Sequence, residues 1–229
     1  MHDAAISNVH AIFAIDRAGI TGEDGETHQG VFDIGFLQTI PHMTVLCPAS
    51  FDELSSALRQ AVYAYDGMVA VRYPKGGEGA YTDCCTDAPS VVLRSDEDAA
   101  VTLVGYGLMI NEILDAAERL EAQGIRTEVI KLYRVLPLDL QEIRQSVQRT
   151  GRLVVAEDCV DAGSIGQMIV SALAQEGICP AVRLINIGDC FLPNGSVKDL
   201  RRLVGLDAEH ISDSAAQICA GDSSESNYL

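Results

Sequence analysis

Short apolar runs alternate with segments of helical periodicity along almost the whole chain, and this alternation restricts the fold more than any other feature. The first three runs are 11–15, 43–47 and 68–73, and a segment with apolar residues at helical spacing, 51–65, precedes the last of them. Short apolar runs bounded by turn signals are typical of buried strands. Strands that alternate with helices form parallel sheets through right-handed crossovers. We therefore expect an α/β fold with a parallel sheet, in which 11–15 is a buried strand.

Capping residues predict where several helices begin and end. Asp33 is expected to cap a short helix that Pro41 ends, and Ser50 with Glu53 has the form of a capping box. Ser164 is expected to cap a later helix. The alternation is then repeated, with strands expected at 101–104, 126–132, 153–156 and 182–187, helices between them, and two short helices near 197–204 and 207–218.

Residues 76–89 separate the two series of strands and helices. This stretch is rich in glycine and has little apolar content, so it is expected to be a linker. The sequence therefore predicts two domains, 1–75 and 90–220, followed by a polar, flexible tail at 221–229. The second domain is of a size that folds alone.

The composition excludes several classes of protein. A net charge of −17 and a pI near 4.5 argue against non-specific nucleic-acid binding and against an anionic membrane surface. No apolar stretch approaches the ~18 residues of a membrane span, and no secretory signal is visible. Seven cysteines without a Cys-x-x-Cys pair indicate free thiols in a reducing cytoplasm, not disulfides or a zinc site. The role of the adjacent Cys84 and Cys85 stays open.

A polar loop rich in glycine follows the first apolar run. It holds Gly19, Gly22, Gly25 and Gly30, which let the backbone take positive φ and come close to a ligand. A loop at the carboxyl end of a parallel strand is where open α/β sheets bind ligands. Polar glycine-rich loops are also common on protein surfaces, so these features alone leave both a ligand site and a plain surface loop open.

Four side chains near this loop and a later strand carry groups suited to catalysis or anion binding. Arg17 and Arg72 lie at or just past the ends of predicted strands, so their guanidinium groups converge on a phosphate if those strands are neighbours. Pairing with local acids is the alternative. His28 is the best candidate for a general acid or base, because histidine titrates near neutral pH. Asp24, in the same loop, is placed to hydrogen-bond a substrate hydroxyl.

Two further segments are interpreted as structural. The Gly-Tyr-Gly sequence at 105–107 lacks the third glycine and the spaced acid of a dinucleotide-binding fingerprint, so a tight turn is favoured over a nucleotide loop. Glu157 and Asp158, followed by two glycines, resemble a site, but a strand end followed by a helix start is favoured.

The loop carries a long and specific motif. Asp-Arg-Ala-Gly at 16–19 is followed by Gly-x-Asp-Gly-x-Thr-His-Gln-Gly-x-Phe-Asp at 22–33. This pattern resembles the pyrimidine-domain loop of 1-deoxy-D-xylulose-5-phosphate synthases, thiamine-diphosphate enzymes of isoprenoid precursor synthesis. Transketolases share the Gly-x-Asp-Gly-x-Thr-His core but lack the Asp-Arg-Ala-Gly lead and have Pro after His-Gln. The likeness continues at 40–43, 70–76 and 191–195 and covers most of residues 1–210, but only the carboxy-terminal portion of such a synthase.

The resemblance implies a fold and an activity. The first domain is expected to be a truncated transketolase-type pyrimidine-binding domain with a partial parallel sheet, and the second a transketolase carboxy-terminal-type α/β domain. The whole enzyme would be a homodimeric transferase that condenses pyruvate with glyceraldehyde 3-phosphate and releases carbon dioxide. In the family, the residues matching Arg17 and Arg72 hold the phosphate of glyceraldehyde 3-phosphate. Those matching Asp24 and His28 contact the substrate and the thiamine-bound intermediate.

The resemblance also implies cofactors whose main binding residues are not found in the chain. The family holds thiamine diphosphate and magnesium with an amino-terminal Gly-Asp-Gly motif and a downstream Asn, and activates the thiamine with a glutamate. Because the cofactor supplies the carbanion chemistry, the chain alone is expected to be inactive and to associate with missing domains. The alternatives are an inactive remnant or split-gene subunit acting in assembly, or a fragment of transketolase or of a 2-oxoacid dehydrogenase β subunit.

Overall fold

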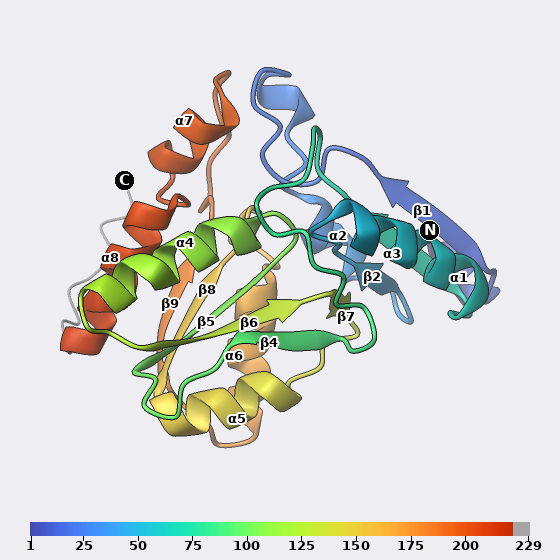
Figure 1. The fold of residues 1–229 in the computed structure, drawn as a ribbon. Coiled ribbons are helices and arrows are strands. Elements are labelled where there is room, and N and C mark those ends of the chain that lie inside the picture. Colours follow the sequence, from blue (N-terminus) through green and yellow to red (C-terminus); the bar gives the residue numbers. More distant parts are fainter. Residues whose placement is uncertain (222–229) are drawn as a thin grey trace.

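The computed structural model describes residues 1–221 and contains two sheets, of strand order β1-β3-β2-β7 and β4-β6-β5-β8-β9 (Figure 1). The strands are β1 (Ala11–Ile15), β2 (Thr44–Leu46), β3 (Met68–Arg72), β4 (Ser90–Arg94), β5 (Val101–Tyr106), β6 (Thr127–Leu132), β7 (Arg134–Leu136), β8 (Arg152–Ala156) and β9 (Ala181–Ile185). The helices are α1 (His2–Ile6), η1 (Glu26–His28, a 3-10 turn), α2 (Asp33–Leu37), α3 (Phe51–Tyr63), α4 (Met109–Ala122), α5 (Gln141–Thr150), α6 (Ile165–Gln175), α7 (Val197–Leu203) and α8 (Ala208–Ala220).

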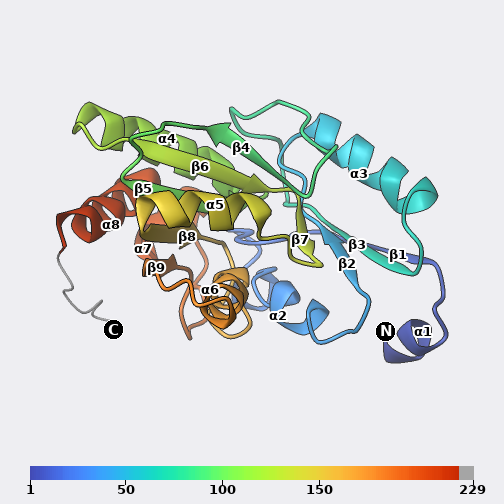
Figure 2. The same cartoon turned by 90° about the horizontal axis from the view of Figure 1, so that it is seen from below.

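Three strands of the first sheet are parallel, as the alternation of strands and helices predicts. β3 lies between β1 and β2, with Arg72 opposite Ile15 and Ala70 opposite Val45. In Figure 2, α3 lies on one side of this sheet and α2 on the other. The carboxyl ends of the three strands therefore meet at one edge, where the loop that follows β1 begins.

β1 is not the buried strand that its apolar sequence predicts. It forms one edge of the first sheet, and its residues alternate between half-buried and exposed, with Ile12 39% exposed. An edge strand has a hydrogen-bonded neighbour on one side only. The prediction was wrong because a short apolar run does not reveal how many neighbours its strand has.

The sequence did not predict β4 or β7. β7 follows β6 in the chain but pairs antiparallel with β2 in the first sheet, where Leu136 lies opposite Val45. β4 pairs antiparallel with β6 at the edge of the second sheet. A strand as short as β7 shows no visible period, so pattern reading does not find it. The first sheet is thus completed by a strand from the second half of the chain.

Most predicted caps are present, but Asp33 is not one. The hydroxyl of Ser50 accepts a hydrogen bond from Glu53 N at 3.1 Å, and Ser164 caps α6 in the same way. Asp33 is the first residue of α2, and its carboxylate accepts from Arg72 Nε at 2.7 Å. A buried carboxylate is costly unless it is paired, so this ion pair takes the place of a cap.

The apolar core lies on both faces of the second sheet and is shared by the two halves of the chain. α4 and α8 cover one face, and α5 and α6 cover the other (Figures 1 and 2). Ile20 and Val31 pack into the first layer, and Ile34 and Leu37 into the second. The two halves of the chain are thus packed together through the same apolar layers. A domain boundary in the linker stays a prediction, although 76–89 has no helix or strand.

No helix within residues 1–221 is both long enough and apolar enough to cross a membrane. Of the predicted tail at 221–229, only Gly221 lies within the described residues. It follows α8 with a left-handed conformation, φ 81°.

Candidate functional site

The loop that follows β1 folds back on itself and is held by its own backbone. Gly19 N donates to Gly30 O at 2.8 Å, and Gly30 N donates to Gly19 O at 2.9 Å. Gly19 has φ +81°, and a Cβ there would lie 1.9 Å from Asp158 Oδ2. A Cβ on Gly30 would lie 1.8 Å from the backbone oxygen of Arg17. Both positions therefore require glycine because other parts of the protein approach them closely.

We expect Gly30→Ala to lower the free energy of unfolding by about 1–3 kcal/mol, because the added methyl group overlaps the Arg17 carbonyl and separates the two arms of the loop. Urea unfolding followed by circular dichroism measures the change. Gly77→Ala is the matched control, since a Cβ there meets no atom within 4 Å. Equal stability of the two variants would contradict the close approach of Gly30 to the backbone of Arg17.

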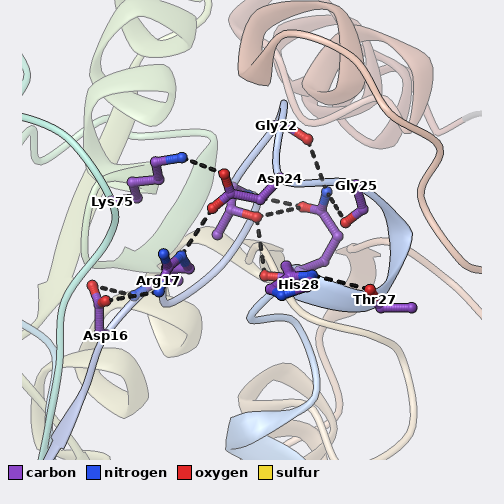
Figure 3. A network of polar contacts seen from close by, with 10 residues as sticks. Asp16, Arg17, Gly22, Asp24, Gly25, Thr27, His28 and Lys75 are labelled. Carbon is purple, nitrogen blue, oxygen red and sulfur yellow. Dashed lines mark hydrogen bonds and ion pairs between the residues drawn. The ribbon is translucent and has the colours of Figure 1, made fainter.

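Gln29 is buried and anchors the tip of the loop. Its Oε1 accepts from Thr21 N at 2.8 Å, and its Nε2 donates to the backbone oxygens of Gly22 and Gly25, each at 3.2 Å (Figure 3). A Cβ on Gly22 would lie 3.1 Å from Gly195 O, in the segment that leads into α7. The tip is thus fixed against the second half of the chain, and its exposed part consists of Glu23 and residues 26–28.

Arg17, Asp24 and Lys75 form an exposed ionic cluster, called the Asp24 cluster below (Figure 3). One carboxylate oxygen of Asp24 accepts from Arg17 Nε at 2.9 Å, and the other accepts from Lys75 Nζ. The Arg17 and Lys75 side chains are 46% and 47% exposed. Hydrogen bonds from Lys75 and Arg17 lower the pKa of Asp24 below its usual value. Asp24 is therefore a carboxylate held between two cations from different parts of the chain.

His28 ends the η1 turn, and its imidazole is exposed to solvent. Its Nδ1 lies 3.0 Å from Thr27 Oγ1, and its backbone oxygen accepts from Thr21 Oγ1 at 3.1 Å (Figure 3). The turn thus fixes the backbone of His28 while its ring stays accessible. An accessible imidazole can reach a substrate and pass a proton to or from it.

Arg72, at the end of β3, is the centre of a second cluster, which is buried. Its Nε donates to Asp33 at 2.7 Å, its Nη1 to Asp158 at 3.3 Å and its Nη2 to Gly30 O at 3.4 Å. The side chain is 3% exposed and lies 5.6 Å from the ring centre of Tyr106. Burial raises the pKa of Asp158, and Arg72 acts in the opposite direction. This Arg72 cluster joins β3 to α2 and to the segment that follows β8.

The two arginines predicted to hold a phosphate lie at the ends of neighbouring strands, β1 and β3, but have different partners. Arg17 lies just beyond β1 with φ 59°, and its side chain faces the exposed acids. The Arg72 guanidinium is buried between two aspartates. Among the described residues, no carboxylate is shared by the two. Only Arg17 is presented to solvent.

Glu157 and Asp158 follow β8 and have separate roles. Glu157 accepts from the backbone N of Ile165 at 2.9 Å and of Gly166 at 2.8 Å, at the start of α6. The Tyr106 hydroxyl donates to it at 2.9 Å. This geometry agrees with a strand end that leads into a helix start. Asp158 belongs instead to the Arg72 cluster.

A pocket of 340 Å³ lies at the carboxyl ends of β1, β2 and β3. Asp16 and Lys75 form part of its wall, so the pocket adjoins the Asp24 cluster. Phe51, Leu54 and Tyr73 contribute to the rest of its lining. A volume of this size suits a small organic molecule, with a cation at its edge to bind a charged group.

Sequence reasoning did not assign four of these residues their place in the site: Gln29 in the loop, Lys75 in the Asp24 cluster, and Asp33 and Asp158 in the Arg72 cluster. Lys75 lies in the turn after β3. The only sequence signal for it was its position, as a basic residue shortly after a predicted strand. Gln29 gives no signal beyond its place in the motif. Asp33 and Asp158 are 39 and 86 residues from Arg72, and no local pattern reveals a partner at such a separation.

Two family models match most of the chain. Residues 1–77 match the pyrimidine binding domain of transketolase, and residues 90–211 match the transketolase C-terminal domain. The chain therefore belongs to the transketolase-like family of thiamine-diphosphate enzymes.

Within this family, the similar curated proteins are 1-deoxy-D-xylulose-5-phosphate synthases, which confirms the resemblance predicted from the loop motif. The synthase of Heliobacterium modesticaldum is 41% identical over an alignment of 231 positions, which covers 99% of this chain and 35% of the relative. That of Chlorobaculum tepidum is 37% identical over 217 residues, 93% of this chain and 34% of the relative. The chain thus spans about a third of the length of these relatives.

Solved structures show the same fold. A split-gene transketolase described as an inactive β4 tetramer has a TM-score of 0.77 and 25% identity, over 91% of this chain and 66% of that one. The transketolase of Campylobacter jejuni has a TM-score of 0.73 and 20% identity, over 93% of this chain and 32% of its own.

Proposed function

We propose that the chain acts as the portion of a 1-deoxy-D-xylulose-5-phosphate synthase that binds glyceraldehyde 3-phosphate, in the condensation with pyruvate that releases carbon dioxide. The observation that carries this proposal is the loop after β1. It carries Arg17, Asp24 and His28 at the carboxyl edge of a parallel sheet. A pocket adjoins the Asp24 cluster through Lys75. Such an edge is the usual ligand-binding place in α/β folds. The similarity to synthases over nearly the whole chain supports the choice of reaction.

The four candidate side chains have distinct proposed roles. Arg17 binds the phosphate, because an exposed guanidinium offers parallel donors to an oxyanion. Asp24 accepts a hydrogen bond from a substrate hydroxyl, and His28 gives or takes a proton as general acid or base. Arg72 is the second proposed phosphate contact. Since its donors are occupied by Asp33 and Asp158, it contacts a ligand only by exchanging one of them.

Thiamine diphosphate, when bound, supplies the carbanion for this reaction. Among residues 1–221, no group of three or more His, Cys, Asp or Glu side chains is arranged to hold a metal ion. We assign none of the described residues to a magnesium–diphosphate site. We propose that the cofactor is held outside these residues, in a cytoplasmic assembly that is a homodimer or includes further domains.

A second candidate function is that of an assembly subunit without activity of its own. The structural likeness to a split-gene transketolase chain, whose tetramer is described as inactive, favours this alternative. In that case the chain would acquire activity only with a partner that provides the remaining part of the synthase. The two candidates differ in whether the exposed loop takes part in the reaction.

We expect the 229-residue chain alone neither to bind thiamine diphosphate and magnesium tightly in calorimetry nor to consume pyruvate.

Together with the amino-terminal two-thirds of the Heliobacterium synthase, the chain should form deoxyxylulose phosphate. His28→Ala should then reduce turnover by about 100-fold or more, because a proton-transfer group is lost. Glu26→Gln is the control, since Glu26 is an exposed residue of the same turn. Micromolar binding of the cofactor by the chain alone would argue against the proposal that the cofactor is held outside the described residues. Full activity of His28→Ala would favour the assembly role.

A further inference from the structure

We propose that the second half of the chain takes part in the reaction site, and that Asp158 is the positioning residue through which it holds the base of the loop after β1. This inference rests on the proposed function. It goes beyond that function, because all the side chains with a proposed role there lie within residues 17–72. Asp158 lies instead in the segment that follows β8.

The base of the loop is formed by Gly19 and Gly30, and Asp158 reaches both. Gly19 packs directly against Asp158, since a Cβ on that glycine would lie 1.9 Å from Oδ2. Gly30 is reached through Arg72, whose Nη1 donates to Asp158 at 3.3 Å and whose Nη2 donates to Gly30 O at 3.4 Å. Arg72 and Asp158 are both buried. Charge-assisted hydrogen bonds gain strength away from water, so this pair holds the two glycines against the segment after β8.

The segment around Asp158 continues along the returning arm of the loop. Val160 N donates to Val31 O at 3.0 Å, one residue beyond the base. A Cβ on Gly35, in α2, would lie 3.1 Å from Ala162 O. The position of the base therefore depends on where this segment of the second half lies, and not on the first sheet alone.

The second half also contacts the tip of the loop. The nearest atoms to a Cβ on Gly22 would be Gly195 O and Val197 Cγ2, each at 3.1 Å. In Figure 1 the loop and the segment that leads into α7 lie side by side. Asp24 and His28 lie in the sequence between the tip and the returning arm, so both attachments constrain where their side chains are presented.

Asp33 also pairs with Arg72 but does not hold the loop. One of its carboxylate oxygens accepts from Arg72 Nε at 2.7 Å, and the other accepts from Ile34 N at 3.0 Å, within α2. If Asp158 loses its charge, Asp33 still neutralises Arg72, and the fold keeps a buried ion pair. A variant of Asp158 therefore separates the positioning of the loop from the stability of this pair.

Hydrogen exchange of the 229-residue chain, followed by NMR, measures how firmly the loop is held. The amides of Gly19 and Gly30 donate to each other's carbonyls, so they report on the base. In Asp158→Asn both should exchange about 5–20-fold faster, because opening of the base needs less free energy. The amides of 101–106, in β5, should keep their rates.

Asp161→Asn is the matched control, because it makes the same chemical change three residues later in the same segment. The Asp161 carboxylate accepts from Gln167 Nε2 at 2.9 Å and from Asn186 Nδ2 at 3.0 Å, within the second half of the chain. This variant should leave the exchange of both glycine amides unchanged. Circular dichroism verifies that the variants fold.

Activity in the assembly with the amino-terminal two-thirds of the Heliobacterium synthase gives a second readout. Asp158→Asn should raise the KM for glyceraldehyde 3-phosphate by about 3–10-fold and leave the KM for pyruvate unchanged, because only the former is proposed to contact the loop. A purely structural role would lower the amount of active enzyme and change neither KM.

Unchanged exchange of Gly19 and Gly30 in Asp158→Asn would overturn the proposal, and so would equally faster exchange of 101–106 or an equal effect of Asp161→Asn. A variant that does not fold would also overturn it, because Asp158 would then serve the fold as a whole. Faster exchange with an unchanged KM in an active assembly would show that the positioning does not serve the reaction.

The exchange measurement needs no turnover, so its result is separate from the test of the proposed function. Faster exchange in Asp158→Asn without any synthase activity of the assembly would support the hold of the second half on the loop and remove the proposed function.

Discussion

Replacing Glu53 with glutamine is expected to lower the free energy of unfolding by about 3–5 kcal/mol, the usual effect of removing one partner of a buried ion pair. Glu53 Oε1 lies 2.6 Å from Lys131 Nζ, and both side chains are 0% exposed. Without the carboxylate, the Lys131 ammonium has no counter-ion at this position. It keeps a neutral amide oxygen and its approach to the rings of Tyr81 and Tyr133, at 5.3 and 5.7 Å. A buried charge without a counter-ion is far less stable than the same charge in water.

Glu53 also connects three parts of the chain, which adds to the expected loss. Its other carboxylate oxygen accepts from Ala49 N at 2.8 Å, at the start of α3. Its Oε1 accepts from the Tyr81 hydroxyl and from Cys85 N, each at 3.1 Å, in the linker. The pair with Lys131 ties α3 and the linker to β6. Because the linker has no helix or strand, these hydrogen bonds fix its path.

A double-mutant cycle measures the effect. Urea unfolding compares Glu53→Gln, Lys131→Met and the double variant, which should recover part of the loss because no unpaired charge remains. Arg94→Gln is the control, since Arg94 pairs with Glu121 at the surface, where a pair is worth about 0–1 kcal/mol. A loss for Glu53→Gln no larger than that of Arg94→Gln would show that the buried pair does not hold the linker.

Local sequence signals were sufficient for most elements of this fold, although not for β4 and β7. The apolar runs predicted the positions of β1, β2 and β3, and the alternation with helices predicted their parallel pairing. The hydroxyl of Ser164 caps α6 as predicted, because capping depends only on residues within one helical turn. The family was also recognisable from the sequence, since the motif at 22–33 in the first half is long and contiguous, and family models match both halves.

Contacts between distant residues were not predictable in the same way. Glu53 has the form of a capping-box acid, and nothing near it indicates that Lys131, 78 residues later, is its partner. The edge position of β1 and the pairing of β7 with β2 likewise depend on the assembled sheet. For the candidate site, the sequence indicated Arg17, Asp24 and His28 as one exposed loop. It did not distinguish the exposed Arg17 from the buried Arg72.

Arg72→Met is expected to lower the free energy of unfolding by about 3–5 kcal/mol at neutral pH. Methionine fills a similar volume but leaves Asp33 and Asp158 buried without the cation that now contacts both, at 2.7 and 3.3 Å. The change also removes the link between β3, α2 and the segment after β8. The loop after β1 should loosen as well, because Arg72 donates to Gly30 O.

The free energy of unfolding lost in Arg72→Met should be larger at neutral pH than at acidic pH. Burial raises the pKa of Asp158 in the folded protein, and Arg72 lowers it, so the pKa rises further in Arg72→Met. A carboxyl group whose pKa is higher in the folded than in the unfolded state destabilises the fold above its folded pKa. That penalty disappears as the pH falls towards the unfolded value of about 3.9. The difference between wild type and variant is therefore largest at neutral pH and shrinks on acidification.

Urea unfolding of both proteins near neutral pH and at about pH 5 tests this sign, because a raised carboxyl pKa takes effect in this range. Arg144→Met is the control: it removes an arginine that pairs with Glu176 at the surface, where both side chains are over a third exposed. The small loss of unfolding free energy in Arg144→Met should not depend on pH in the same way, since this variant leaves no carboxylate buried. A loss for Arg72→Met that is equal at both pH values would show that the two aspartates are not held as unpaired charges. Arg72 would then stabilise the fold through packing on Tyr106 and not through its charge.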